Sequence, residues 1–137
     1  MKQKVLFLCT GNSCRSQMAE AIVNARLGDR WEASSAGTKP VGYVHPKALE
    51  ALHQIGINHN GRSKSVDEFR GADFDLVVTL CDSAAEECPV WIGKGKRTHH
   101  GFPDPAETYD MRVFRKVRDD IARDIIALLQ DYEKGAV

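Results

Sequence analysis

Two short apolar segments constrain the fold of this chain more than any other feature. Residues 5–8 and 74–80 are rich in Val, Leu and Phe and lack a regular alternation of polar residues. Strands of this kind are buried on both faces, as in a parallel sheet that is covered by helices. Residues 31–35 predict a weaker strand, and residues 98–102 predict a short fourth strand.

Helical segments separate these strands. Residues 16–27 have apolar side chains at helical spacing, and Pro46 suits the first turn of a second helix that Gly56 ends. Ser65 stands at capping-box spacing from Glu68 and is expected to open a short helix. A long amphipathic helix follows near the C-terminus, with apolar residues at Phe114, Val117, Ile121, Ile125, Leu128 and Tyr132.

Strands that alternate with helices predict an α/β fold. We expect residues 1–137 to form a single domain with an open, mainly parallel four-stranded sheet flanked by helices. Residues 83–87 are good helix formers and predict a further helical segment.

Composition and charge exclude several classes of function. Lys plus Arg total 19 and Asp plus Glu total 19, whereas nucleic-acid binding requires an excess of basic residues. The apolar run at residues 5–9 is shorter than a secretory segment of about 7–15 residues or a membrane helix of about 20. We therefore expect a cytoplasmic protein without nucleic-acid or membrane partners. In a reducing compartment its cysteines should not form a structural disulfide framework.

Three residues whose side chains can take part in a reaction follow predicted strands. Cys9, Cys81 and Asp104 each come just after the carboxyl end of a strand. Ligands of open parallel sheets bind beyond these ends. The sequence therefore predicts a site at this edge of the sheet.

The segment between the first strand and the first helix predicts an oxyanion site. Backbone N–H groups of a tight turn and a helix N-terminus can cradle a tetrahedral anion, and an Arg fork can bind two of its oxygens. Cys9 at the mouth is expected to be a thiolate nucleophile, further stabilised by the Ser16 hydroxyl. The residues expected to bind the oxyanion are Thr10, Gly11, Asn12, Ser13, Cys14 and Arg15.

The chain resembles the low-molecular-weight protein tyrosine phosphatase superfamily, and within it the thioredoxin-coupled arsenate reductases. The resemblance rests on residues 5–20 with Cys-Thr-Gly-Asn-Ser-Cys-Arg-Ser, and continues through residues 35–37, 76–81, 88–89 and 101–106. It implies a low-molecular-weight phosphatase-like fold. It also implies that Asp104 is the general acid that protonates a leaving oxygen.

The second pair of cysteines distinguishes the two branches of the superfamily. Reduction of arsenate needs two electrons, which two thiols supply when they become a disulfide, whereas a phosphatase needs one nucleophile. Ala106 after Asp104-Pro105, where phosphatases tend to carry aromatic residues, indicates room only for a small substrate. The alternative is a phosphatase that hydrolyses phosphate monoesters through a Cys9 phosphoenzyme.

The resemblance implies a relay of three thiols in arsenic detoxification. Cys9 attacks arsenate, Cys81 displaces arsenite to form a Cys9–Cys81 disulfide, and Cys88 then attacks Cys81 and presents Cys81–Cys88 to thioredoxin. An intact helix between Cys81 and Cys88 would hold their Cα atoms about 10.5 Å apart, beyond the reach of a disulfide. We therefore expect this segment to be helical when reduced and partly unwound when oxidised.

Other features of the sequence leave alternatives open. Asn12, Glu20 and Ser35 match positions that bind potassium in some family members, but Ser65 stands where the family has a further carboxylate. Potassium is therefore a candidate ion only, and no tightly bound cofactor is expected. Cys14 is either a packing residue or a partner in a protective bridge with Cys9. A zinc site built from the cysteines with His99 or His100 and an oxyanion sensor without turnover are the rival interpretations.

Overall fold

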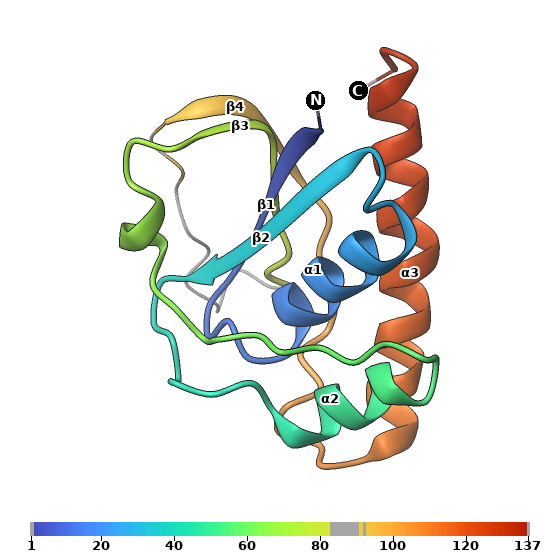
Figure 1. Ribbon diagram of the computed structural model, residues 1–137. Coiled ribbons are helices and arrows are strands. Elements are labelled where there is room, and N and C mark those ends of the chain that lie inside the picture. The colour runs from blue at the N-terminus through green and yellow to red at the C-terminus, as the bar shows by residue number, and fades with distance from the viewer. Residues whose placement is uncertain (1, 83–90, 92, 137) are drawn as a thin grey trace.

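The computed structural model describes residues 2–82, 91 and 93–136 (Figure 1). In this part of the chain a parallel sheet has the strand order β2-β1-β3-β4, which confirms the predicted fold class. The strands are β1 (Gln3–Cys9), β2 (Trp31–Gly37), β3 (Asp73–Thr79) and β4 (Lys94–His99). Cys88 and the helix expected at residues 83–87 lie outside the described residues.

The helices begin close to where the sequence predicts them. They are α1 (Arg15–Arg26), α2 (Pro46–His53) and α3 (Met111–Glu133), with a short 3₁₀-helix η1 (Val66–Phe69) before β3. Ser65 caps η1 by accepting a hydrogen bond from the Asp67 N–H at 3.1 Å. Glu68 forms an ion pair with Arg62 at 2.7 Å, so the expected capping box is only half formed.

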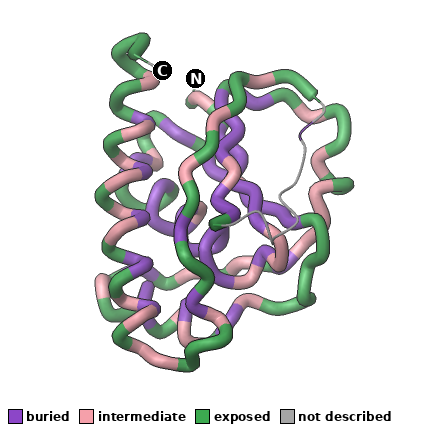
Figure 2. The backbone as a smooth tube through the Cα atoms, turned by 180° about the vertical axis from the view of Figure 1, so that it is seen from behind, coloured by how far each residue is buried: buried purple, intermediate pink, exposed green. Residues whose placement is uncertain are grey.

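The main core lies between the sheet and the helices α1 and α3, which cover one of its faces (Figure 1). Figure 2 shows the buried residues concentrated along the central strands and the inner side of α3. The predicted apolar stripe of α3 is confirmed from Phe114 to Ile125; beyond it Leu129 is fully buried, whereas the predicted Leu128 and Tyr132 are only partly buried. On the other face, Leu6, Leu8 and Val77 pack with Phe74 and Trp91.

The position of the fourth strand differs from the prediction. Residues 98–102 were expected to form it, but β4 runs from Lys94 to His99. Most of its residues are exposed, and within the described part of the chain it pairs with β3 alone, at the edge of the sheet. An edge strand held by backbone hydrogen bonds needs few apolar side chains, so its start has no apolar signature in the sequence.

The register of the sheet brings the strand ends together. Leu8 pairs with Thr79 of β3, and Cys9 pairs with Gly37 of β2. The carboxyl ends of these three strands therefore lie side by side, which is where the sequence predicts the site. Among the described residues, no helix combines the length and apolarity that crossing a membrane would require.

Candidate active site

The turn between β1 and α1 has the geometry of an anion-binding loop. Asn12 adopts a left-handed conformation with φ of 49°, and its N–H donates to Cys9 Sγ at 3.3 Å. Among the residues that the structure describes, no side chain caps the N-terminus of α1 at Cys14. The turn therefore presents backbone N–H groups and the positive end of a helix, a combination that binds tetrahedral oxyanions.

Cys9 lies at the base of this loop with only 2% of its surface exposed. Its Sγ is 2.8 Å from Ser16 Oγ. Ser16 Oγ accepts a hydrogen bond from Asn12 Nδ2 at 2.8 Å, which leaves the hydroxyl proton to be donated to the sulfur. The Ser16 O–H and the Asn12 N–H can thus stabilise a thiolate at Cys9.

Arg15 is the first residue of α1, and its guanidinium is buried beside the loop. It donates to the Phe102 carbonyl at 3.1 Å and more weakly to the Leu80 carbonyl at 3.4 Å. These bonds fix the guanidinium plane against the segments that follow β3 and β4. A buried Arg held in this way is suited to binding an anion through two of its nitrogens.

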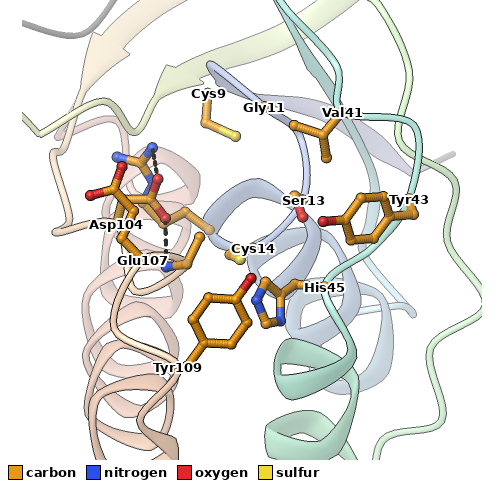
Figure 3. A pocket seen from close by; sticks show the side chains of 12 residues that line it. Cys9, Gly11, Ser13, Cys14, Val41, Tyr43, His45, Asp104, Glu107 and Tyr109 are labelled. Atoms are coloured by element: carbon orange, nitrogen blue, oxygen red, sulfur yellow. Dashed lines mark hydrogen bonds and ion pairs between the residues drawn. The ribbon is translucent and has the colours of Figure 1, made fainter.

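Asp104 lies at the rim of the same pocket (Figure 3). One carboxylate oxygen accepts from the Ala106 N–H at 3.0 Å, and the other is 3.6 Å from an Arg15 nitrogen. Its side chain is 43% exposed. The carboxyl group is held in place but can still exchange a proton with water.

The pocket has a volume of about 230 Å³. Besides Arg15 and Asp104 it is lined by Cys9, Gly11, Ser13, Cys14, Val41, Tyr43, His45, Ala106, Glu107 and Tyr109. Most of the predicted loop residues thus face one cavity; Asn12 and Ser16 lie behind it and bond Cys9.

Sequence reasoning missed the aromatic border of this pocket. Tyr43 and Tyr109 are 57% and 68% exposed and line the cavity (Figure 3). The pocket therefore has aromatic walls in addition to Ala106, and the expectation of a small substrate stays a prediction. The rings come from the segment after β2 and from the residue before Asp110, not from the positions directly after Asp104-Pro105.

Cys14 also lines the pocket. Burial, followed by the charge of Asp104, raises the pKa of Cys14 to about 12. It is therefore a protonated thiol at neutral pH. Cys9 and Cys14, which both line the pocket, are not joined by a disulfide in this structure.

Cys81 is buried and lies just after β3, the strand that neighbours β1. The Leu80 N–H donates to the Leu8 carbonyl at 2.8 Å and continues the pairing of the two strands to their ends. A second thiol thus stands at the same sheet edge as Cys9. Cys88, the remaining member of the predicted relay, lies outside the described residues.

His45 links two walls of the pocket. Its Nδ1 accepts from the Lys47 N–H at 3.1 Å and caps α2, while the ring donates to the Ala106 backbone and packs on Phe114. Burial, followed by the charge of Lys47, lowers the pKa of His45. The neutral ring therefore ties the N-terminus of α2 to the segment that carries Asp104.

Asn12, Glu20 and Ser35, the residues that match potassium ligands, lie in the loop or close to it. Ser35 Oγ donates to Glu20 Oε1 at 2.9 Å, and Asn12 Oδ1 accepts from the Lys64 N–H at 2.9 Å and from Gln17 at 3.0 Å. For the zinc alternative, no group of three or more His, Cys, Asp or Glu residues within residues 2–82, 91 and 93–136 is placed to hold a metal ion.

Comparison with known proteins gives a consistent result. Residues 4–136 match the family described as low molecular weight phosphotyrosine protein phosphatase. The arsenate reductase of Halalkalibacterium halodurans is 45% identical over 130 residues, which cover 90% of this chain and 93% of that protein.

Two solved structures are also similar to the chain. The arsenate reductase of Archaeoglobus fulgidus has a TM-score of 0.77 at 32% identity, with 92% of this chain and 98% of that chain covered. A low molecular weight protein tyrosine phosphatase from T. tengcongensis has a TM-score of 0.72 at 29% identity, with 95% of this chain and 99% of that chain covered.

The loop should not tolerate a side chain at Gly37. A Cβ there would collide with the Thr10 carbonyl oxygen and lie 2.9 Å from the Cys9 carbonyl oxygen, both backbone atoms with little freedom to move. Gly37→Ala should lower the free energy of unfolding by about 1–3 kcal/mol. It should also weaken binding of inorganic phosphate, measured by calorimetry. Ser34→Ala, on the same strand, is the control, and equal urea unfolding of the two variants would contradict this account.

Stability should decline in mildly acidic solution because of His45. Its pKa is lowered in the folded chain, so the unfolded chain binds more protons below about pH 6.5 and the free energy of unfolding falls there. His45→Asn keeps a side chain that can cap α2 and should flatten part of this decline. Urea unfolding between about pH 8 and pH 5 measures it. The exposed His53→Asn variant should keep the wild-type profile; the same slope in His45→Asn would refute the assignment.

Proposed function

The chain belongs to the low molecular weight phosphotyrosine protein phosphatase family, and we propose that within this family it is an enzyme that reduces arsenate to arsenite. The similarity to proteins named arsenate reductase supports the proposal, because it extends over nearly the whole length of both chains. The family also includes phosphatases, so the choice between the two reactions depends on the chemistry of the site.

Cys81 is the observation that carries the proposal. Hydrolysis of a phosphate ester through Cys9 needs no second thiol, whereas reduction of As(V) to As(III) needs two thiols that can become a disulfide. Cys81 is buried just after the end of β3, and β3 pairs with the strand that ends in Cys9. A second cysteine at the same sheet edge as Cys9 supports a reaction that needs two thiols.

The first step forms a covalent adduct. The loop N–H groups and Arg15 bind arsenate, and the Cys9 thiolate attacks its arsenic atom. A sulfur–arsenic bond forms and an arsenic–oxygen bond breaks. Asp104 donates a proton so that the oxygen leaves as water.

The next two steps are thiol exchanges. The Cys81 thiolate attacks Cys9 Sγ to form a disulfide, and the electron pair of the sulfur–arsenic bond passes to arsenic, which leaves as arsenite. Cys88 then attacks Cys81, so that Cys9 is released as a thiolate and a Cys81–Cys88 disulfide remains.

A dithiol partner has to complete the cycle by reducing the Cys81–Cys88 disulfide. Thioredoxin is the reductant that we propose. Thioredoxin keeps thiols reduced in the cytoplasm, which is where we propose that this enzyme works. The role in the cell would be detoxification of arsenate.

Substitution of the cysteines separates the two reactions. Cys9→Ser should abolish both arsenate reduction and hydrolysis of an aryl phosphate, because both need the nucleophile. Cys81→Ser and Cys88→Ser should each stop multiple-turnover reduction but leave aryl phosphate hydrolysis at the wild-type level, which is the internal control for folding. NADPH consumption in the presence of thioredoxin and thioredoxin reductase measures the reductase reaction.

Two outcomes of these assays would reject the proposal. Full reductase turnover in Cys81→Ser or Cys88→Ser would exclude the relay. Wild-type enzyme that hydrolyses aryl phosphate rapidly and does not consume NADPH with arsenate would be a phosphatase. The tyrosines that border the pocket make this second assay necessary.

Asp104→Asn should slow formation of the Cys9 adduct by about 10²–10⁴-fold and spare the later thiol exchange. The exchange needs no proton for an oxygen leaving group. Rapid-quench single-turnover kinetics resolve the two phases. Glu107→Gln is the matched control, since it removes another carboxylate from the same pocket. Loss of the first phase in Glu107→Gln with an unchanged rate in Asp104→Asn would assign the acid to Glu107.

A further inference from the structure

Glu20 places a negative charge beneath the oxyanion loop. It lies on α1, and only 13% of its side chain is exposed. Ser35 Oγ donates to Glu20 Oε1, but one hydroxyl bond does not compensate a charge that is largely removed from water. A nearby positive charge is needed to stabilise the Glu20 carboxylate.

Lys64 provides that charge. Its Nζ is 3.7 Å from the oxygen that Ser35 contacts, and 12% of its side chain is exposed. The ammonium also donates to the Arg62 carbonyl at 3.0 Å. His59 Nε2 is 3.7 Å from the other Glu20 oxygen, but it donates to Gln17 Oε1 at the much shorter distance of 2.7 Å.

The backbone of Lys64 connects this charge to the nucleophile. Its N–H donates to Asn12 Oδ1. The same Asn12 side chain donates to Ser16 Oγ, which contacts Cys9 Sγ. A continuous series of hydrogen bonds therefore runs from Lys64 to the reactive sulfur.

These contacts do not leave an open set of ligands for potassium. Asn12 Oδ1 accepts two protein N–H groups, Ser35 Oγ is bonded to Glu20, and the cation beside Glu20 is the Lys64 ammonium. The donor set that suggests a potassium site in the sequence is thus engaged by the chain itself.

We propose that Lys64 supplies the positive charge which a bound potassium ion would otherwise provide, and that it is a positioning residue for Cys9. The ammonium neutralises Glu20, while the backbone of the same residue holds the Asn12 side chain. The enzyme should therefore work equally well with and without potassium.

The test compares variants in potassium chloride and in choline chloride at equal ionic strength. Wild type, Lys64→Arg and the exposed-surface control Lys116→Met should show the same rate of arsenate reduction in both salts. Lys64→Met should lose about 10–100-fold in choline chloride, as found when outer residues of a site are removed. Potassium or ammonium ions should restore most of the loss by entering the vacated space beside Glu20.

A second measurement does not depend on the activity, which rests on the proposed function. The midpoint of thermal unfolding of Lys64→Met should rise by a few degrees in potassium chloride relative to choline chloride, because the ion binds the folded state. Wild type and the doubly neutral variant Glu20→Gln/Lys64→Met should show no such rise. If Lys64→Met does not fold in choline chloride, the double variant should still fold, since it leaves no unpaired charge.

The proposal is wrong if the wild type is activated or stabilised by potassium relative to choline. It is also wrong if Lys64→Met matches the wild type in choline chloride, or if neither potassium nor ammonium stabilises that variant. A potassium-dependent rise in its unfolding midpoint without any arsenate reduction by the wild type would support the role of Lys64 and reject the proposed function instead.

Discussion

The site depends on the left-handed turn at Asn12. Because the backbone reverses there, the Asn12 N–H faces Cys9 Sγ. Its side chain at the same time donates to Ser16 and accepts from Lys64 and Gln17. One residue therefore shapes the cradle, orients the hydroxyl beside the sulfur and fastens the loop to the segment before η1. Asn is among the few residues that adopt this conformation readily and can make all these bonds.

The strand order brings residues from outside the loop to the site. Cys9, Cys81 and Asp104 are far apart in the sequence, and they lie at one edge of the sheet because β1 pairs with β3 and β3 pairs with β4. Arg15 reinforces this arrangement through its bonds to the Leu80 and Phe102 carbonyls. The Arg15 guanidinium, which is suited to binding an anion, also holds the three segments together. The same group therefore serves both anion binding and the stability of the fold.

The sequence predicted those parts that carry a local signal. Patterns among neighbouring residues predict the apolar strands, the apolar stripe of the last helix and the loop between Cys9 and Ser16. The structure contains all of these elements. The start of β4 was missed because an exposed edge strand needs backbone pairing rather than apolar side chains. The Tyr43 and Tyr109 rings and the contact of Lys64 with Glu20 were missed because they join segments that are far apart in the chain. Only the packing of those segments, which no local spacing encodes, brings them to the site.

The polar character of β4 has a consequence for the behaviour of the protein in concentrated solution. Among the described residues β4 is an outer strand of the sheet, and the backbone groups on its outer side could recruit a strand from another copy. Lys94, Lys96 and Arg97 project positive charge from this strand and are exposed. Two such edges would repel each other on approach. The polar composition of β4, which makes the strand difficult to predict from the sequence, thus also opposes edge-to-edge aggregation of the chains.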